Sequence, residues 1–176
     1  CMKDGKNDYE FVEINKDTKL TYIDRWILNK LNRTIKSFDE SFEAYNFAEA
    51  TSGIYSFWQD ILCDVYVEAV KPIFTAGNAP NASEEAKTTA NISKNVLIKC
   101  IDAGLKILHP LMPFITEELY QRLPLKLETE SICISSFPTY EEYFVDDNLN
   151  KQSETLFNIS HSVLSIISQF QINKIK

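Results

Sequence analysis

The stretch TYIDRWILNKLNRTIKSFDESF, residues 21–42, carries the clearest structural signal in the chain. At about 100° per residue, its apolar side chains fall on one face of a helix. These side chains are Ile27, Leu28, Leu31, Ile35, Phe38 and Phe42. The opposite side carries Arg25, Lys30, Arg33 and Lys36. Thr21 or Asp24 can cap the start, so the stretch is predicted to be an amphipathic helix with a basic outer face.

A second helix is predicted to follow directly. Asn46 can cap its start, and a broad apolar stripe continues from there to about Lys71. Pro72 is expected to end this helix, because proline disfavours a helical residue before it. The composition of residues 72–83 then favours a loop.

The second half of the chain has the same helical character. Ser83 is followed by two acidic residues, which indicates the start of a third helix that runs to about Leu108. A short amphipathic helix is predicted over 113–123 and a last helix over about 147–170. Residues 131–135 could form a brief strand, although no partner strand is evident.

The fold predicted from these elements is an all-α, up-and-down helix bundle with a short irregular or strand-like segment and a C-terminal helix. Scarce glycine and proline, 4 and 6 residues, argue against a β-sandwich or barrel. The predicted segments are a lead-in at 1–20, the helical bundle at 21–124, an irregular connector at 125–146, and a C-terminal helix at 147–176 that packs on the same domain.

The composition limits the kinds of partner and the cellular compartment that are expected for the chain. The chain has 176 residues, a net charge of −7 and a pI near 4.9, so any nucleic-acid binding has to depend on a local basic patch. No run reaches the roughly 18 apolar residues that a membrane span needs, and no membrane partner is expected. Four cysteines without zinc spacing are typical of a reducing compartment, and a cytoplasmic location is predicted.

No pattern in the sequence indicates catalysis. Neither His109 nor His161 follows a glutamate at the spacing of di-metal bundles. The four glycines are isolated, which excludes a P-loop or a Rossmann turn, and no serine or cysteine lies in a glycine-rich elbow. The chain is therefore expected to hold no catalytic residue, no metal and no cofactor.

Basic helix faces remain as candidate binding sites. The first set is Arg25, Lys30, Arg33 and Lys36, with Tyr22 and Trp26 close by. The second set, on the third helix, is Lys94, Lys99 and Lys106. Basic residues interleaved with aromatic ones suit recognition of RNA backbone and bases. The alternative is a solvated face whose lysines pair with the acidic second helix.

Five segments, in order, carry a resemblance to a known family. They are DRWILNKLN at 24–32, YNFAEA with YSFW at 45–58, CDVYVEAVKP at 63–72, HPLMPFITEELYQRLP at 109–124, and SICIS followed by FP at 131–138. Together they resemble the anticodon-binding domain of class I aminoacyl-tRNA synthetases, in the branch that activates branched aliphatic amino acids. The third and fourth segments are most similar to the valyl members.

This resemblance implies a function for the chain. The parent enzyme would join valine to tRNA with ATP and Mg²⁺, in a catalytic domain of the same polypeptide that this chain does not contain. The chain itself would grip the anticodon stem-loop of tRNA(Val) and position it. The basic residues of the first helix, with those of the third as second choices, are the expected tRNA-binding residues.

Two alternatives stay open at this point. The chain could be the equivalent domain of an isoleucyl-tRNA synthetase. It could also be a helical protein-interaction module derived from a synthetase, with the acidic second helix and the tyrosine-rich segment 139–144 as its contact surface.

Overall fold

The computed structural model describes residues 12–124 and 129–169, so residues 1–11 of the predicted lead-in, 125–128 of the connector and 170–176 of the last helix lie outside it. The helices are α1 (Tyr22–Glu43), α2 (Phe47–Ser56), the π-helical η1 (Phe57–Tyr66), α3 (Val67–Gly77), α4 (Glu84–Leu108), α5 (Pro113–Tyr120) and α6 (Asp147–Gln169). No strand occurs in the described ranges, which confirms the predicted all-α fold.

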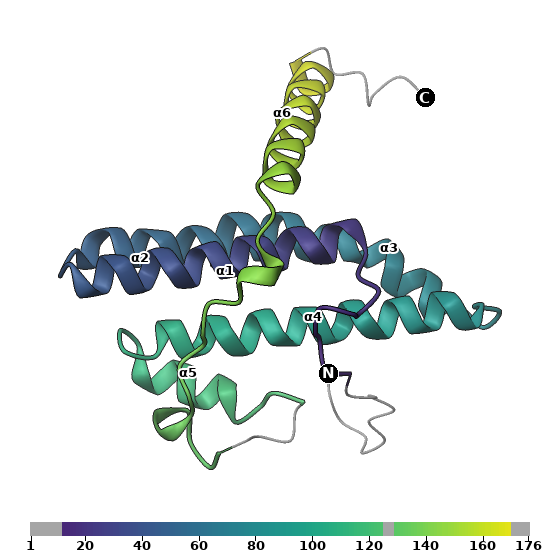
Figure 1. Ribbon diagram of the computed structural model, residues 1–176. Helices are drawn as coiled ribbons and strands as arrows, with labels where there is room; N and C mark the ends of the chain where they lie inside the picture. The colour runs from purple at the N-terminus through teal and green to yellow at the C-terminus, as the bar shows by residue number, and fades with distance from the viewer. Residues whose placement is uncertain (1–11, 125–128, 170–176) are drawn as a thin grey trace.

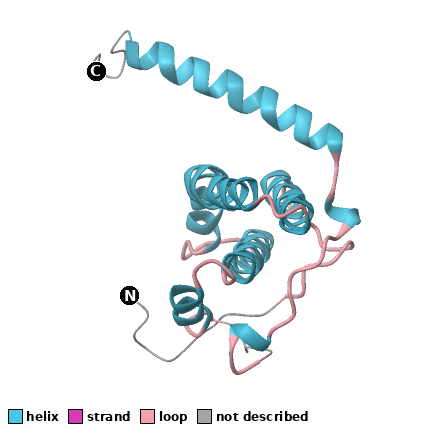
Figure 2. Ribbon diagram, turned by 90° about the vertical axis from the view of Figure 1, so that its left-hand side faces the viewer, coloured by secondary structure: helices cyan, strands magenta, loops and turns pink. Residues whose placement is uncertain are grey.

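The helices form two layers and a projecting arm. Figure 1 shows α1 alongside the rod made by α2, η1 and α3, with α4 beneath them and α5 folded back under one end of α4. Figure 2 looks along these helices and shows α6 running across them. Most of the buried apolar side chains come from α1, the rod and α4, and they form one core.

Helix α1 begins where the sequence predicted. Thr21 is the N-cap: its side chain accepts a hydrogen bond from the Asp24 amide, and the Asp24 carboxylate accepts one from the Thr21 amide, both at 3.3 Å. This capping box satisfies donors that a helix start otherwise leaves free. The predicted apolar face is buried from Ile27 to Phe38, but Phe42, near the end of α1, is exposed.

Asp24 also joins three elements inside the core. Its side chain is fully buried and accepts hydrogen bonds from the Tyr66 hydroxyl of η1 at 2.7 Å and the Ser93 hydroxyl of α4 at 2.9 Å. The Thr21 hydroxyl donates a further one at 2.6 Å. Burial, followed by the charge of Asp24, raises the pKa of Tyr66, so this phenol remains a donor.

The prediction that Pro72 ends the second helix is wrong. Residues 47–77 form one continuous rod, because the backbone at the α2–η1 and η1–α3 junctions stays helical. Val70 is buried before the proline and Phe74 packs on the core after it. This packing outweighs the one hydrogen bond that the proline cannot donate. The loop is accordingly shorter than predicted, between Gly77 and Glu84.

After α5, residues 121–124 and 129–146 contain no strand. Residues Ile132–Ile134 form a short 3-10 turn, η2, and Glu142–Phe144 form a second one, η3. The predicted strand fails because the segment pairs with a side chain instead of another backbone. Glu117 of α5 accepts hydrogen bonds from the Ser131 hydroxyl at 2.7 Å and from the Ile132 amide at 3.1 Å. Hydrogen bonds from Gln121 and Ser131 lower the pKa of Glu117.

The first half of α6 packs on α1. The ring of Phe157 meets Trp26 edge-on at 5.0 Å, and the Ser153 and Tyr22 hydroxyls lie 2.9 Å apart. Beyond this point Ile159, Val163 and Ile166 are exposed. Within the described residues, no helix is long and apolar enough to cross a membrane.

Replacing Asp24 by alanine removes the shared acceptor of the core and half of the capping box. We expect Asp24→Ala to lower the free energy of unfolding by about 3 kcal/mol, because the Tyr66 and Ser93 hydroxyls lose a buried partner. Urea denaturation followed by circular dichroism measures this change. Asp17→Ala, at an exposed loop position, is the control and should stay within about 0.5 kcal/mol of the unchanged protein. Equal effects of the two substitutions would contradict the role given to Asp24.

Glu117 makes part of the stability depend on pH. Its pKa is lower in the folded than in the unfolded chain, so its contribution is complete above the ordinary carboxyl range and is lost as pH falls below about 5. Glu117→Gln cannot ionise, so we expect a lower stability at pH 7 and a shallower loss between about pH 5 and pH 3. Urea titrations at several pH values test this, with the exposed Glu118→Gln as control. Parallel pH curves for the Glu117 variant and the unchanged chain would overturn the assignment.

Candidate nucleic-acid interface

Two of the four predicted basic residues of α1, Lys30 and Arg33, form ion pairs with α6. The Lys30 ammonium is 3.6 Å from Glu154, and its side chain is only 19% exposed. Arg33 forms an ion pair with Asp147 and also donates to the Asn29 side chain. Arg25 is exposed. The carboxylates that pair with these cations come from α6, not from the acidic second helix as the alternative prediction held.

Two buried asparagines of α1 explain this arrangement. Asn29 donates to the carbonyl of Asp146 at 2.7 Å, and Asn32 accepts from the amide of Glu141 at 2.7 Å. Both amide side chains are almost fully buried. They hold the connector between η2 and α6 against the middle of α1, and so determine which residues surround Lys36.

Lys36 lies among aromatic rings. Its ammonium is 5.6 Å from the centre of the Tyr140 ring, on the connector, and 3.9 Å from Glu40. Its side chain is more than half exposed. A cation over an aromatic face is attracted to the ring while keeping its outer side free for an anion.

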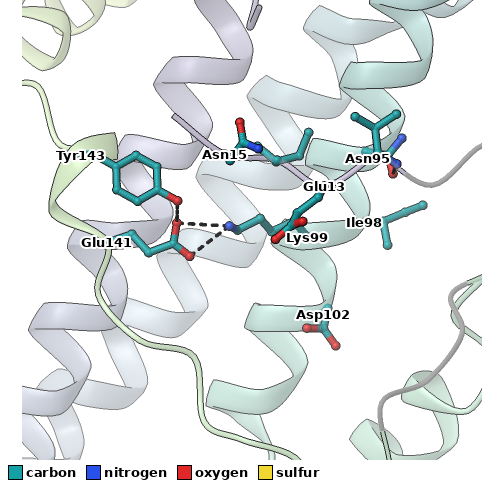
Figure 3. A pocket seen from close by; sticks show the side chains of 10 residues that line it. Glu13, Asn15, Asn95, Ile98, Lys99, Asp102, Glu141 and Tyr143 are labelled. Atoms are coloured by element: carbon teal, nitrogen blue, oxygen red, sulfur yellow. Dashed lines mark hydrogen bonds and ion pairs between the residues drawn. The ribbon is translucent and has the colours of Figure 1, made fainter. Parts of the chain in front are cut away.

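The predicted lysines of α4 do not join this group. Figure 3 shows Lys99 in a pocket of about 430 Å³, where its ammonium is 3.0 and 3.2 Å from the two oxygens of Glu141. Tyr143 donates to the same carboxylate at 2.5 Å, and burial together with this hydrogen bond raises the pKa of Tyr143 to about 12. With Glu13 and Asp102 also lining it, the pocket is unsuited to a phosphate.

The other two α4 lysines also have partners. Lys106 pairs with Asp102 at 2.8 Å, is only 11% exposed, and lies 5.9 Å from the Tyr120 ring centre. Lys94 is within 3.4 Å of the Asn78 side-chain oxygen. The two sets of basic residues therefore lie on different parts of the bundle and form no common patch.

A chain of aromatic rings, which the sequence reasoning missed, continues from Lys36 toward the α1–α2 turn. Phe38 stacks on Phe42 at 5.3 Å and on Phe137 of the connector at 5.9 Å. Phe47 meets Phe42 edge-on at 5.3 Å and Tyr45 at 6.3 Å. Four of these rings, all except Phe38, are exposed.

Tyr45 is the most unusual residue of this group. Its φ of 58° lies in the left-handed region of backbone conformation, which residues other than glycine rarely adopt. The residue is also 81% exposed. The turn imposes this backbone, since the amide of Asn46 donates to Ser41 at 2.8 Å. The signal in the sequence was the run of aromatic residues around 42–47, but helical periodicity assigned Phe42 to the core.

We call this surface the α1 flank and define it by its exposed or half-exposed members. They are Arg33, Lys36, Phe42, Tyr45, Phe47, Phe137 and Tyr140. The carboxylates of Asp39, Glu40 and Glu43 lie on the same part of α1, and burial together with the charge of Glu43 raises the pKa of Asp39. Cations that hold phosphates beside rings that stack on bases are what a single-stranded RNA loop requires.

In the part of the chain that the structure describes, no group of histidine, cysteine, aspartate and glutamate side chains could hold a metal ion. Among the described cysteines, Cys63 and Cys133 are exposed and Cys100 is buried.

Comparison with known proteins identifies the family of the chain. Residues 24–176 match the family model described as the anticodon-binding domain of tRNA ligase. A valine–tRNA ligase of Fervidobacterium nodosum is 39% identical over 165 residues, which cover 94% of this chain and 17% of that protein. The valine–tRNA ligases of Takifugu rubripes and Homo sapiens are 35% and 32% identical, over 86% and 88% of this chain.

The chain spans 12 to 17% of the length of these relatives. The family model, by contrast, matches all the described helices of this chain, apart from the first two residues of α1. The chain belongs to the family of anticodon-binding domains of tRNA ligases.

Proposed function

We propose that this chain is the module of a valine–tRNA ligase that grips the anticodon stem-loop of tRNA(Val). The α1 flank is the observation that carries the proposal, because it places Arg33 and Lys36 next to a row of exposed rings. Family membership and the valine–tRNA ligase relatives support the choice of tRNA. The basic residues predicted from the sequence are part of this proposal, with those of α1 ranked above those of α4.

Different parts of the α1 flank would contact different parts of the RNA. Phosphates of the stem would lie against Arg33 and Lys36, releasing counterions. Unpaired bases of the loop would stack on Tyr45 and Phe47, whose faces are available at the turn. The ion pair of Arg33 with Asp147 is on the surface and is weak enough for a phosphate to compete with it.

Aminoacylation would take place in another part of the parent polypeptide. A catalytic domain there would use ATP and Mg²⁺, and this chain would hold neither. The parent would work in the cytoplasm, in keeping with the free thiols of Cys63, Cys100 and Cys133.

A contact with protein is favoured at a part of the surface outside the α1 flank. Phe114, at the start of α5, is 90% exposed, and Leu111, Met112 and Ile115 beside it are also exposed. Clustered apolar side chains of this kind mark contact with protein. We assign this corner to the catalytic domain of the same polypeptide, so the contact complements RNA binding rather than replacing it.

Removing the α1 cations should weaken binding and reduce its dependence on salt. We expect Lys30→Ala, Arg33→Ala and Lys36→Ala together to lower the slope of log K against log salt by about 2, because Arg33 and Lys36 would each lose a phosphate contact that is worth nearly one unit. Fluorescence anisotropy with the tRNA(Val) anticodon stem-loop measures the slope. A control with the same charge change is Lys19→Ala, Lys71→Ala and Lys87→Ala, all in exposed ion pairs elsewhere. An unchanged slope in the α1 variant would remove this face from the interface.

Removing the rings at the turn should weaken binding at every salt concentration. We expect Tyr45→Ala or Phe47→Ala to cost about 1 to 3 kcal/mol of binding free energy, the usual effect of one lost base–aromatic stack. Tyr55→Ala, an exposed tyrosine on α2 outside the flank, is the matched control and should bind normally. If the three variants bind the stem-loop equally well, the bases do not stack at this turn.

A further inference from the structure

A cysteine and a histidine face each other where α4, α5 and η2 meet. His109 Nε2 is 3.0 Å from Cys133 Sγ, and His109 Nδ1 is 2.7 Å from Thr116 Oγ1. Cys133 is exposed, His109 is half-buried at the end of α4, and Thr116 is fully buried in α5. A reagent in solution can therefore reach the thiol, while the other two groups are held in place.

The hydrogen bonds of Thr116 determine which nitrogen of His109 carries the proton. The Thr116 hydroxyl donates to the carbonyl of Met112 at 2.8 Å, with that of Pro113 at 3.1 Å. A hydroxyl has a single proton, so a Thr116 hydroxyl that donates to Met112 accepts from His109. Nδ1 therefore carries the hydrogen, and the lone pair of Nε2 points at the Cys133 thiol. Cys133 is then the nucleophile, His109 the base, and Thr116 the group that orients the base. This arrangement activates cysteine thiols.

Charge at this corner favours the same arrangement. Glu117 lies on α5, ties η2 to that helix, and interacts electrostatically with His109. A carboxylate near an imidazole stabilises the positive charge that the ring gains when it takes up the thiol proton during attack. His109 from α4, Glu117 from α5 and Cys133 from η2 are the titratable groups that the described residues bring into contact here.

We propose that Cys133 is a nucleophilic thiol that low-molecular-weight disulfides modify. The thiol proton passes to His109 Nε2, and the Cys133 sulfur attacks one sulfur of the disulfide. A new S–S bond forms to Cys133 as the original S–S bond breaks. The departing thiolate takes the proton from His109 and leaves as a free thiol. The disulfide is the oxidant, so no other reactant is required.

The chain contains its own controls for a test. Cys63 is exposed on η1 and makes no hydrogen bond or ion pair within the described residues, so it reports the reactivity of an ordinary surface thiol. Cys100 is buried, and burial raises the pKa of its thiol, so it should remain unmodified. Peptide mass spectrometry distinguishes the sites without any substitution.

The whole chain is incubated with the neutral reagent hydroxyethyl disulfide. At pH 7 we expect Cys133 to form the mixed disulfide about tenfold faster than Cys63, because His109 takes up the proton of the attacking thiol. The ratio should fall toward one near pH 9, since thiols in general form thiolate there without the help of a base. His109→Asn should reduce the Cys133 rate to that of Cys63. Equal rates in the unchanged chain would overturn the proposal, as would an unaltered Cys133 rate in a His109→Asn protein with normal circular dichroism.

Discussion

The carboxylate of Asp24 is withdrawn from solvent at the point where α1, η1 and α4 meet, and it accepts hydrogen bonds from all three sides. A buried carboxylate is costly unless its oxygens are satisfied, so Thr21, Tyr66 and Ser93 must stay within reach of it. This requirement fixes the rotation of α1 about its own axis. The apolar face of α1 then points into the core, and Asn29 and Asn32 point toward the connector.

The candidate interface follows from that rotation. Asn29 and Asn32 bind the backbone of the connector, which places Tyr140 under Lys36 and Phe137 against Phe38. The surface is therefore composite, with cations from α1 and rings from α1, α2 and the connector. In a chain with a net charge of −7, this surface brings Arg33 and Lys36 together with exposed rings, while Asp39, Glu40 and Glu43 lie on the same part of α1.

The sequence predicted the fold better than it predicted the site. Helical periodicity and capping residues located α1, α4 and α6 closely, because both signals act within a few turns. The prediction at Pro72 was wrong because the packing of Val70 and Phe74 on the core decides whether that helix continues. This packing exists only in the folded chain. For the same reason, the ion pairs of Lys30 and Lys99 could not be predicted, since their partners lie on other elements. The i,i+4 spacing of Asp102 and Lys106 in α4, by contrast, already indicates their pair. The exposed rings at 42–47 have no sequence signature that separates them from core residues.

The most direct test of the account is a titration of the isotope-labelled chain with the tRNA(Val) anticodon stem-loop, followed by amide chemical shifts. The account predicts that shifts concentrate at Arg33, Lys36, Tyr45, Phe47 and Tyr140, and that the distal turns of α6 and the exposed corner at Phe114 stay unchanged. Shifts confined to α6 or to the Phe114 corner, or no shifts with excess RNA, would contradict it.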